Sequence, residues 1–224
     1  MTKVYPNANV AAAATATAPS IPAKPQASDV NATVLTVWKK SLLFNCNGFT
    51  VFDSKGDLVF RVDNYIQGVK GEIVLMDAAG KPLLTIRRKR LSLGDNWLVY
   101  DGEKTDVNPR FSVKKHVNIL TNKCLARVSC NGGDGSSSSS SSSPTNNKNV
   151  LYEIQGSYAQ RACAVYDGRR RRVAEIKKKE AVGGVAFGSD VFRLIVQPEM
   201  ETAVAMGLVI LLDQMFGSSG RLSL

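Results

Sequence analysis

The chain has 224 residues, of which 44% are hydrophobic, so it can bury one substantial core or at most two small ones, and we expect one main domain. Lysine and arginine total 29 against 19 acidic residues, and the formal net charge of +10 favours an anionic partner: phospholipid, nucleic acid or an acidic protein. With a single histidine, His116, the composition argues against histidine-based catalysis and against a zinc centre.

Residues 1–29 hold an alanine and threonine run followed by three prolines, Pro19, Pro22 and Pro25. The run is not apolar enough for a secretory signal peptide. A chloroplast-type transit peptide stays an alternative, because no acidic residue precedes Asp29, although arginine is absent as well. We expect a disordered N-terminal tail on a cytoplasmic protein.

From Val30 onward, apolar runs of four to seven residues alternate with turn residues, a spacing too short for helices. This pattern predicts an all-β domain, and a count near a dozen favours a large sandwich or a barrel. Candidate strands begin near Val34, Leu42, Phe49, Leu58, Glu72, Leu83, Trp97, Arg110, Cys124, Leu151, Ala162, Arg171 and Val191.

Three predicted hairpin turns connect consecutive strands. Residues 53–56 and 77–80 each begin with Asp and end with Gly, as a type I turn followed by a residue at positive φ requires. Asp167-Gly168 is typical of a tight type I′ turn. A calcium loop at residues 53–57 is disfavoured, because Lys55 occupies a position where an oxygen ligand is needed.

The four cysteines, Cys46, Cys124, Cys130 and Cys163, fall in predicted strands and form no CxxC pair. We expect small buried hydrophobic residues in a reducing compartment. No metal site and no cofactor are expected, and the chain is predicted not to be an enzyme.

Residues 131–149 interrupt the strand pattern with a glycine-rich start, eight consecutive serines and an asparagine-rich exit. This composition cannot form a packed element, so it predicts a disordered low-complexity loop between two strands.

The chain ends differently, with a helix predicted from Pro198 and Glu199 onward through residues 200–216. Residues 203–212 are apolar on every face, so this helix must be surrounded by protein or by a membrane. Ten residues reach only about 15 Å, which is too short to span a bilayer. An eight-stranded barrel is filled by its own side chains, whereas about twelve strands can enclose a helix. We therefore predict a closed antiparallel β-barrel of about twelve strands around a central hydrophobic C-terminal α-helix, over residues 30–216, with a tail at 217–224.

Several separated segments resemble the plant LURP-one-related family: residues 42–53, 56–65, 83–88 and 97–100, and the terminal helix with its Leu211-Leu212-Asp213. The family is grouped with tubby-like domains and phospholipid scramblases. The resemblance implies a twelve-stranded barrel around a central helix and a link to plant defence. It supplies no catalytic residues, and a membrane-tethered transcriptional role is suggested only by analogy with tubby.

Three basic clusters are candidate binding sites for anionic headgroups. These clusters lie at predicted strand ends. Charged side chains in contact with water at such positions discourage the pairing of exposed strand edges, and this role explains the clusters equally well. If four to six of the side chains shared a face, they would form a phosphate-binding surface. The clusters comprise Arg87, Arg88, Lys89, Arg90, Arg169, Arg170, Arg171, Arg172, Lys177, Lys178 and Lys179.

The leading hypothesis is a non-enzymatic module that recognises acidic phospholipid, such as a phosphoinositide, or a partner protein, at a membrane surface. The alternative is a protein-interacting adaptor or transcriptional regulator whose basic segments serve nuclear import. Nucleic acid is disfavoured, because the clusters lack interleaved aromatic residues. Scramblase-like lipid translocation is the weakest hypothesis, since no segment is long enough to cross a membrane.

Overall fold

The computed structural model describes residues 31–43, 47–64, 71–89, 95–116, 124–130, 150–181 and 187–217. The predicted N-terminal tail, the predicted loop at 131–149 and residues 218–224 lie outside these ranges, as do Cys46 and Arg90.

The described residues form twelve strands and one helix, α1 (Thr202–Phe216). The strands are β1 (Thr33–Trp38), β2 (Asn47–Phe52), β3 (Leu58–Asn64), β4 (Glu72–Asp77), β5 (Pro82–Arg88), β6 (Asn96–Asp101), β7 (Phe111–Lys115), β8 (Cys124–Cys130), β9 (Val150–Ser157), β10 (Ala162–Asp167), β11 (Arg172–Lys178) and β12 (Val191–Val196).

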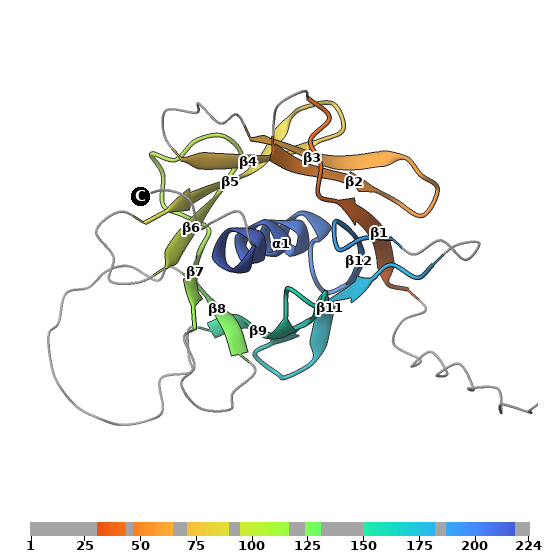
Figure 1. Cartoon of the computed structure of the whole chain (residues 1–224). Helices are drawn as coiled ribbons and strands as arrows, with labels where there is room; N and C mark the ends of the chain where they lie inside the picture. Colours follow the sequence, from red (N-terminus) through yellow and green to blue (C-terminus); the bar gives the residue numbers. More distant parts are fainter. Residues whose placement is uncertain are drawn as a thin grey trace, which may run out of the picture.

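The twelve strands close into one antiparallel barrel. Each strand pairs with its neighbours in sequence, and β1 pairs with β12 in a register that runs from Thr33–Val196 to Trp38–Val191. Figure 1 looks into the barrel and shows α1 inside the ring of strands. The predicted fold class is therefore confirmed.

The core consists of α1 and of the alternate strand side chains that point inward. In β12, Phe192, Leu194 and Val196 are buried, while the residues between them are partly exposed. The helix is buried on every face from Ala203 to Asp213. Such a helix has no polar stripe for water, so it is stable only inside the barrel.

The up-and-down strand order gives the barrel two rims. The helix-start rim carries the connections β2–β3, β4–β5, β6–β7, β8–β9 and β10–β11 and the link from β12 to α1. The helix-end rim carries the other connections and the last turn of α1. Arg110 reaches Glu201 at 2.7 Å on the first rim. Lys115 donates to the carbonyl oxygen of Met215 at 2.7 Å on the second.

The two predicted Asp-to-Gly turns are confirmed. Gly56 and Gly80 lie at φ 90° and 87°, in a region that favours glycine. Their backbone N–H groups donate to the carbonyl oxygens of Asp53 and Asp77 at 3.3 and 3.1 Å.

The predicted two-residue turn at Asp167-Gly168 is wrong. The β10–β11 connection repeats the other two turns, and Arg170 occupies the left-handed position with φ 62° while donating its N–H to Asp167. This left-handed conformation is unfavourable for a residue other than glycine, because its Cβ atom comes too close to the following carbonyl oxygen. The Asp167 carboxylate offsets this cost by accepting the N–H groups of Arg169 and Arg171 at 2.9 and 2.8 Å.

Two predicted element starts are also wrong. No strand begins at Leu42, which is exposed in the β1–β2 connection, and the next strand begins at Asn47. The helix begins at Thr202, later than predicted. The residues before it turn the chain into the barrel, where Met200 donates its N–H to the carbonyl oxygen of Gln197.

Candidate functional site

The three predicted basic clusters lie at different places on the barrel. Residues 169–172 form the β10–β11 turn and the start of β11, at the helix-start rim. Residues 87–89 and 177–179 lie at the ends of β5 and β11, both at the helix-end rim. β5 and β11 are six strands apart in either direction round the ring, on opposite walls (Figure 1). The clusters therefore do not form the single shared face that the lipid hypothesis considered.

Most side chains of these clusters are held in ion pairs. A carboxylate beside an arginine offsets its charge, so such a side chain attracts an external anion weakly. The pairs and their N–O separations are Arg87–Glu72 (3.6 Å), Arg88–Asp95 (2.6 Å), Arg170–Glu153 (3.3 Å), Arg171–Asp167 (2.8 Å), Arg172–Glu175 (3.1 Å) and Lys177–Glu175 (3.0 Å).

Three of the described lysines that have no acidic partner lie together at the helix-end rim, where β1 and β11 flank β12. They are Lys40 after β1 and Lys178 and Lys179 at the end of β11, which we call the lysine rim. None of the three forms an ion pair with a described residue. The Lys40 ammonium lies 5.5 Å from the centre of the Trp38 ring, and that of Lys179 lies 5.3 Å from the centre of the Phe187 ring.

A buried polar network holds the end of α1 at the same rim. The Asp213 carboxylate lies 2.9 Å from the ammonium of Lys39 and accepts the hydroxyl of Tyr158 at 3.1 Å. Burial raises the pKa of Tyr158, and the charge of Asp213 acts in the same direction, so the hydroxyl keeps its proton. The Arg161 guanidinium covers the Tyr158 ring at 4.1 Å. This network is enclosed and ties α1 to the barrel wall.

A surface groove of about 810 Å³ lies on the outside of β9, β10 and β11. Ala162 and Ala164 form its floor, because these small residues of β10 lie between longer side chains of the neighbouring strands. Lys177 and Glu175 on its wall form an ion pair. The volume matches that of small-molecule sites, but the groove is open to solvent, and its single carboxylate, Glu175, is already paired with Lys177.

Within the described ranges, no three histidine, cysteine or acidic side chains are grouped as a metal site would require. No described helix is long and apolar enough to cross a membrane.

The prediction of buried cysteines is partly confirmed. Cys124 and Cys163 are buried free thiols, whereas Cys130 is exposed, so the prediction is wrong for that residue. Cys46 lies outside the described residues. Burial raises the pKa of Cys163 to about 11.

This pKa predicts a loss of stability at alkaline pH. Between the unfolded value of 9.0 and the folded value of about 11, the unfolded chain releases the Cys163 proton while the folded chain keeps it. Raising the pH through this window should lower the free energy of unfolding by about 2 kcal/mol. Urea unfolding at several pH values should show a shallower decline for Cys163→Ala, whereas Cys130→Ala should follow the unmodified protein. Equal slopes for all three proteins would contradict the prediction.

The lysine rim was only partly predicted from the sequence, which identified Lys178 and Lys179 but missed Lys40 and the aromatic residues. The run Trp38-Lys39-Lys40 at the end of a strand could have pointed to them, because an aromatic ring beside two lysines is unusual where a strand leads into a solvated turn.

Comparison with known proteins supports this fold. The LURP-one-related family model matches residues 33–213. Protein LURP-one-related 8 of Arabidopsis thaliana is 58% identical over 192 residues, which cover 84% of this chain and 89% of that relative. Protein LURP-one-related 17 of the same plant is 43% identical, with coverage of 82% and 83%. An X-ray structure of an Arabidopsis thaliana protein matches with a TM-score of 0.57 at 23% identity, over 82% of this chain and 90% of that one, which supports the fold alone. The chain therefore belongs to the LURP-one-related family.

Proposed function

We propose that this protein is a non-catalytic module that binds peripherally to membrane surfaces containing acidic phospholipid. The lysine rim is the observation that carries the proposal, because Lys40, Lys178 and Lys179 lie together on one rim and have no acidic partner among the described residues. Each lysine contributes about 1 kcal/mol near an anionic leaflet. Three lysines give about 3 kcal/mol, which makes the binding weak, reversible and dependent on salt.

A lipid surface fits this arrangement better than nucleic acid does. The single described helix is enclosed by strands, so it cannot enter a DNA groove (Figure 1). Binding of single strands uses aromatic rings on which bases stack. Among the described residues, Trp38 and Phe187 are the only exposed aromatic side chains, too few for a row of successive stacked bases.

Vesicle sedimentation tests the proposal. The double variant Lys178→Gln/Lys179→Gln should bind vesicles of phosphatidylcholine and phosphatidylserine about 30-fold more weakly, since it loses about 2 kcal/mol. The matched control is Lys55→Gln/Lys81→Gln, which removes the same charge from two exposed turns at the helix-start rim. The control should bind like the unmodified protein.

Salt and lipid composition supply the deciding comparison. Binding should fall between about 0.05 and 0.5 M salt, because exposed charges are screened over about 4 Å at the higher value and about 14 Å at the lower. If the unmodified protein does not sediment with anionic vesicles at low salt, the lipid proposal fails. An equal loss in both double variants would show that net charge, and not the lysine rim, is responsible.

A protein-interacting adaptor is the second candidate, and the groove on β9, β10 and β11 favours it. A partner segment could lie along Ala162 and Ala164 between the walls of neighbouring strands. Failure of vesicle binding would leave this candidate as the better one.

A further inference from the structure

Exposed hydrophobic side chains gather around the lysine rim. Of the six large hydrophobic residues that are exposed within the described ranges, four lie at the helix-end rim in the β1–β2 and β11–β12 connections or at the end of β1. They are Trp38 (43% exposed), Leu42 (52%), Leu43 (38%) and Phe187 (39%), and we call them the apolar rim.

The two aromatic residues of the apolar rim belong to neighbouring parts of the barrel: Trp38 ends β1, and Phe187 lies in the connection that leads into its neighbour β12. The Lys179 ammonium is 3.3 Å from the hydroxyl oxygen of Thr36 and also covers Phe187. Thr36 and Trp38 point to the same outer face of β1, about 7 Å apart along the strand. The Lys179–Phe187 pair therefore lies beside the Lys40–Trp38 pair.

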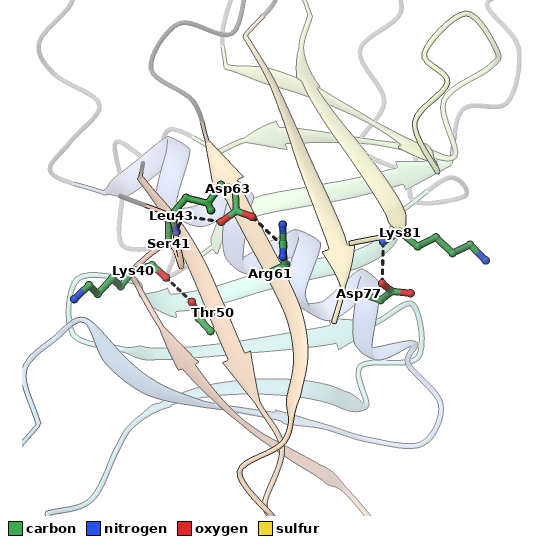
Figure 2. Close-up of polar contacts among 8 residues, drawn as sticks. All are labelled: Lys40, Ser41, Leu43, Thr50, Arg61, Asp63, Asp77 and Lys81. Atoms are coloured by element: carbon green, nitrogen blue, oxygen red, sulfur yellow. Dashed lines mark hydrogen bonds and ion pairs between the residues drawn. The ribbon is translucent and has the colours of Figure 1, made fainter. Parts of the chain in front are cut away.

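A buried polar network positions the leucines. The Ser41 hydroxyl donates to Asp63 at 2.6 Å and accepts the N–H of Leu43 at 3.0 Å. Arg61 reaches the Asp63 carboxylate from the other side at 2.9 Å (Figure 2). Thr50 is buried and donates to the carbonyl oxygen of Lys40 at 2.6 Å. These buried hydrogen bonds and the ion pair thus fix the position of the exposed residues Leu42 and Leu43.

The charges near the apolar rim favour an anionic partner. Glu180 pairs with Arg193 at 3.7 Å, and Asp190 is an exposed carboxylate in the same connection as Phe187. The three lysines of the lysine rim outnumber the Asp190 carboxylate, so the charge beside the apolar rim is positive. A second copy of the chain is a poor partner, because a symmetric contact would bring the two lysine rims together.

We infer that the apolar rim inserts into the interfacial layer of an anionic bilayer while the lysine rim contacts the phosphate groups above it. Tryptophan, phenylalanine and leucine are favoured at that depth, and lysine stems can lie along apolar surface with the ammonium in the headgroup region. The inference rests on the proposed function and deepens it, because it assigns a docking face and an inserted anchor.

Fluorescence of Trp38 tests insertion directly. The chain has two tryptophans, and Trp97 is buried with no hydrogen-bond partner for its indole nitrogen among the described residues. Trp97→Phe therefore removes no described hydrogen bond and leaves Trp38 as the single reporter. Adding vesicles of phosphatidylcholine and phosphatidylserine should shift its emission to shorter wavelength, and lipids brominated near the headgroup should quench it.

A second pair of variants separates insertion from charge attraction. Leu42→Ser/Leu43→Ser should weaken vesicle binding about tenfold or more, and the loss should persist at high salt. Val107→Ser is the control, since Val107 is 53% exposed at the helix-start rim, and it should leave binding unchanged.

The outcomes distinguish this inference from the proposed function. Vesicle binding that is salt-sensitive but leaves Trp38 emission unchanged would overturn insertion and leave the proposed function intact. Absence of binding at low salt would remove both. A Trp38 shift that depends on protein concentration without vesicles, together with dimers in size-exclusion chromatography, would show that a second copy covers the apolar rim and would overturn the inference.

Discussion

A chain that ends at Gln197 is expected not to fold, because it lacks α1. The helix buries eight large hydrophobic side chains: Val204, Met206, Leu208, Val209, Ile210, Leu211, Leu212 and Met215. Each contributes about 1.5–3 kcal/mol, so their loss removes roughly 12–24 kcal/mol. Most of this range lies above the net stability of a typical domain, which is about 5–15 kcal/mol. The truncated protein should be insoluble or lack a cooperative transition in urea.

The matched control is a chain that ends at Gly217, which keeps all of α1 and the hydrogen bond from the Gly217 N–H to the carbonyl oxygen of Asp213. It should unfold at the same urea concentration as the full chain. A monomeric chain ending at Gln197 with an unchanged transition would contradict the role of α1 as the core.

Asp213→Ala is expected to lower the free energy of unfolding by about 2–3 kcal/mol. The change leaves the Lys39 ammonium and the Tyr158 hydroxyl without their partner at the buried end of α1. Breaking a buried ion pair costs about 3–5 kcal/mol. Two effects reduce this value: Lys39 keeps 22% of its side chain exposed, and a carboxylate at a helix C-terminus is itself unfavourable by about 0.3–1 kcal/mol.

Urea unfolding of a double-mutant cycle with Lys39→Met measures the pair. The double variant should be less destabilised than the two single changes combined, because it leaves no unpaired ammonium. Asp213→Asn should lose less than Asp213→Ala, since the amide oxygen can still accept the Tyr158 hydroxyl. Additive effects in the cycle would show that Lys39 and Asp213 do not stabilise each other.

Much of the barrel could be predicted from local patterns. Period-2 alternation marks β12, and a helix that is apolar on every face requires an enclosing wall. The errors occur where a distant contact decides the local structure. Leu42 resembles the start of a strand, but Ser41 beside it is held by Asp63, 22 residues further along the chain. Arg170 adopts positive φ because Asp167 fixes the turn. The sequence concealed this, because the glycine of the turn, Gly168, does not stand at the residue with positive φ.

The candidate site was less predictable, because charge runs are visible in a sequence and their partners are not. Successive strands of this barrel run in opposite directions, so odd-numbered strands end at one rim and even-numbered strands at the other. The rim at which each cluster lies could therefore have been inferred by counting the predicted strands. The ion pairs could not: Arg170 meets Glu153 only through the register of β9 and β10. The apolar rim was missed because its leucines were assigned to a strand.

The pairing of β1 with β12 constrains how the protein forms during synthesis on the ribosome. A growing chain emerges from its N-terminus, so β1 lacks its β12 partner until residues 191–196 have been made, and α1 follows later still. Until then the inward faces of the strands have nothing to pack against. Such long-range closure slows folding and leaves apolar surface open to aggregation. The wall of this protein is therefore translated before the core that fills it, and its folding must be completed after most of the chain has left the ribosome.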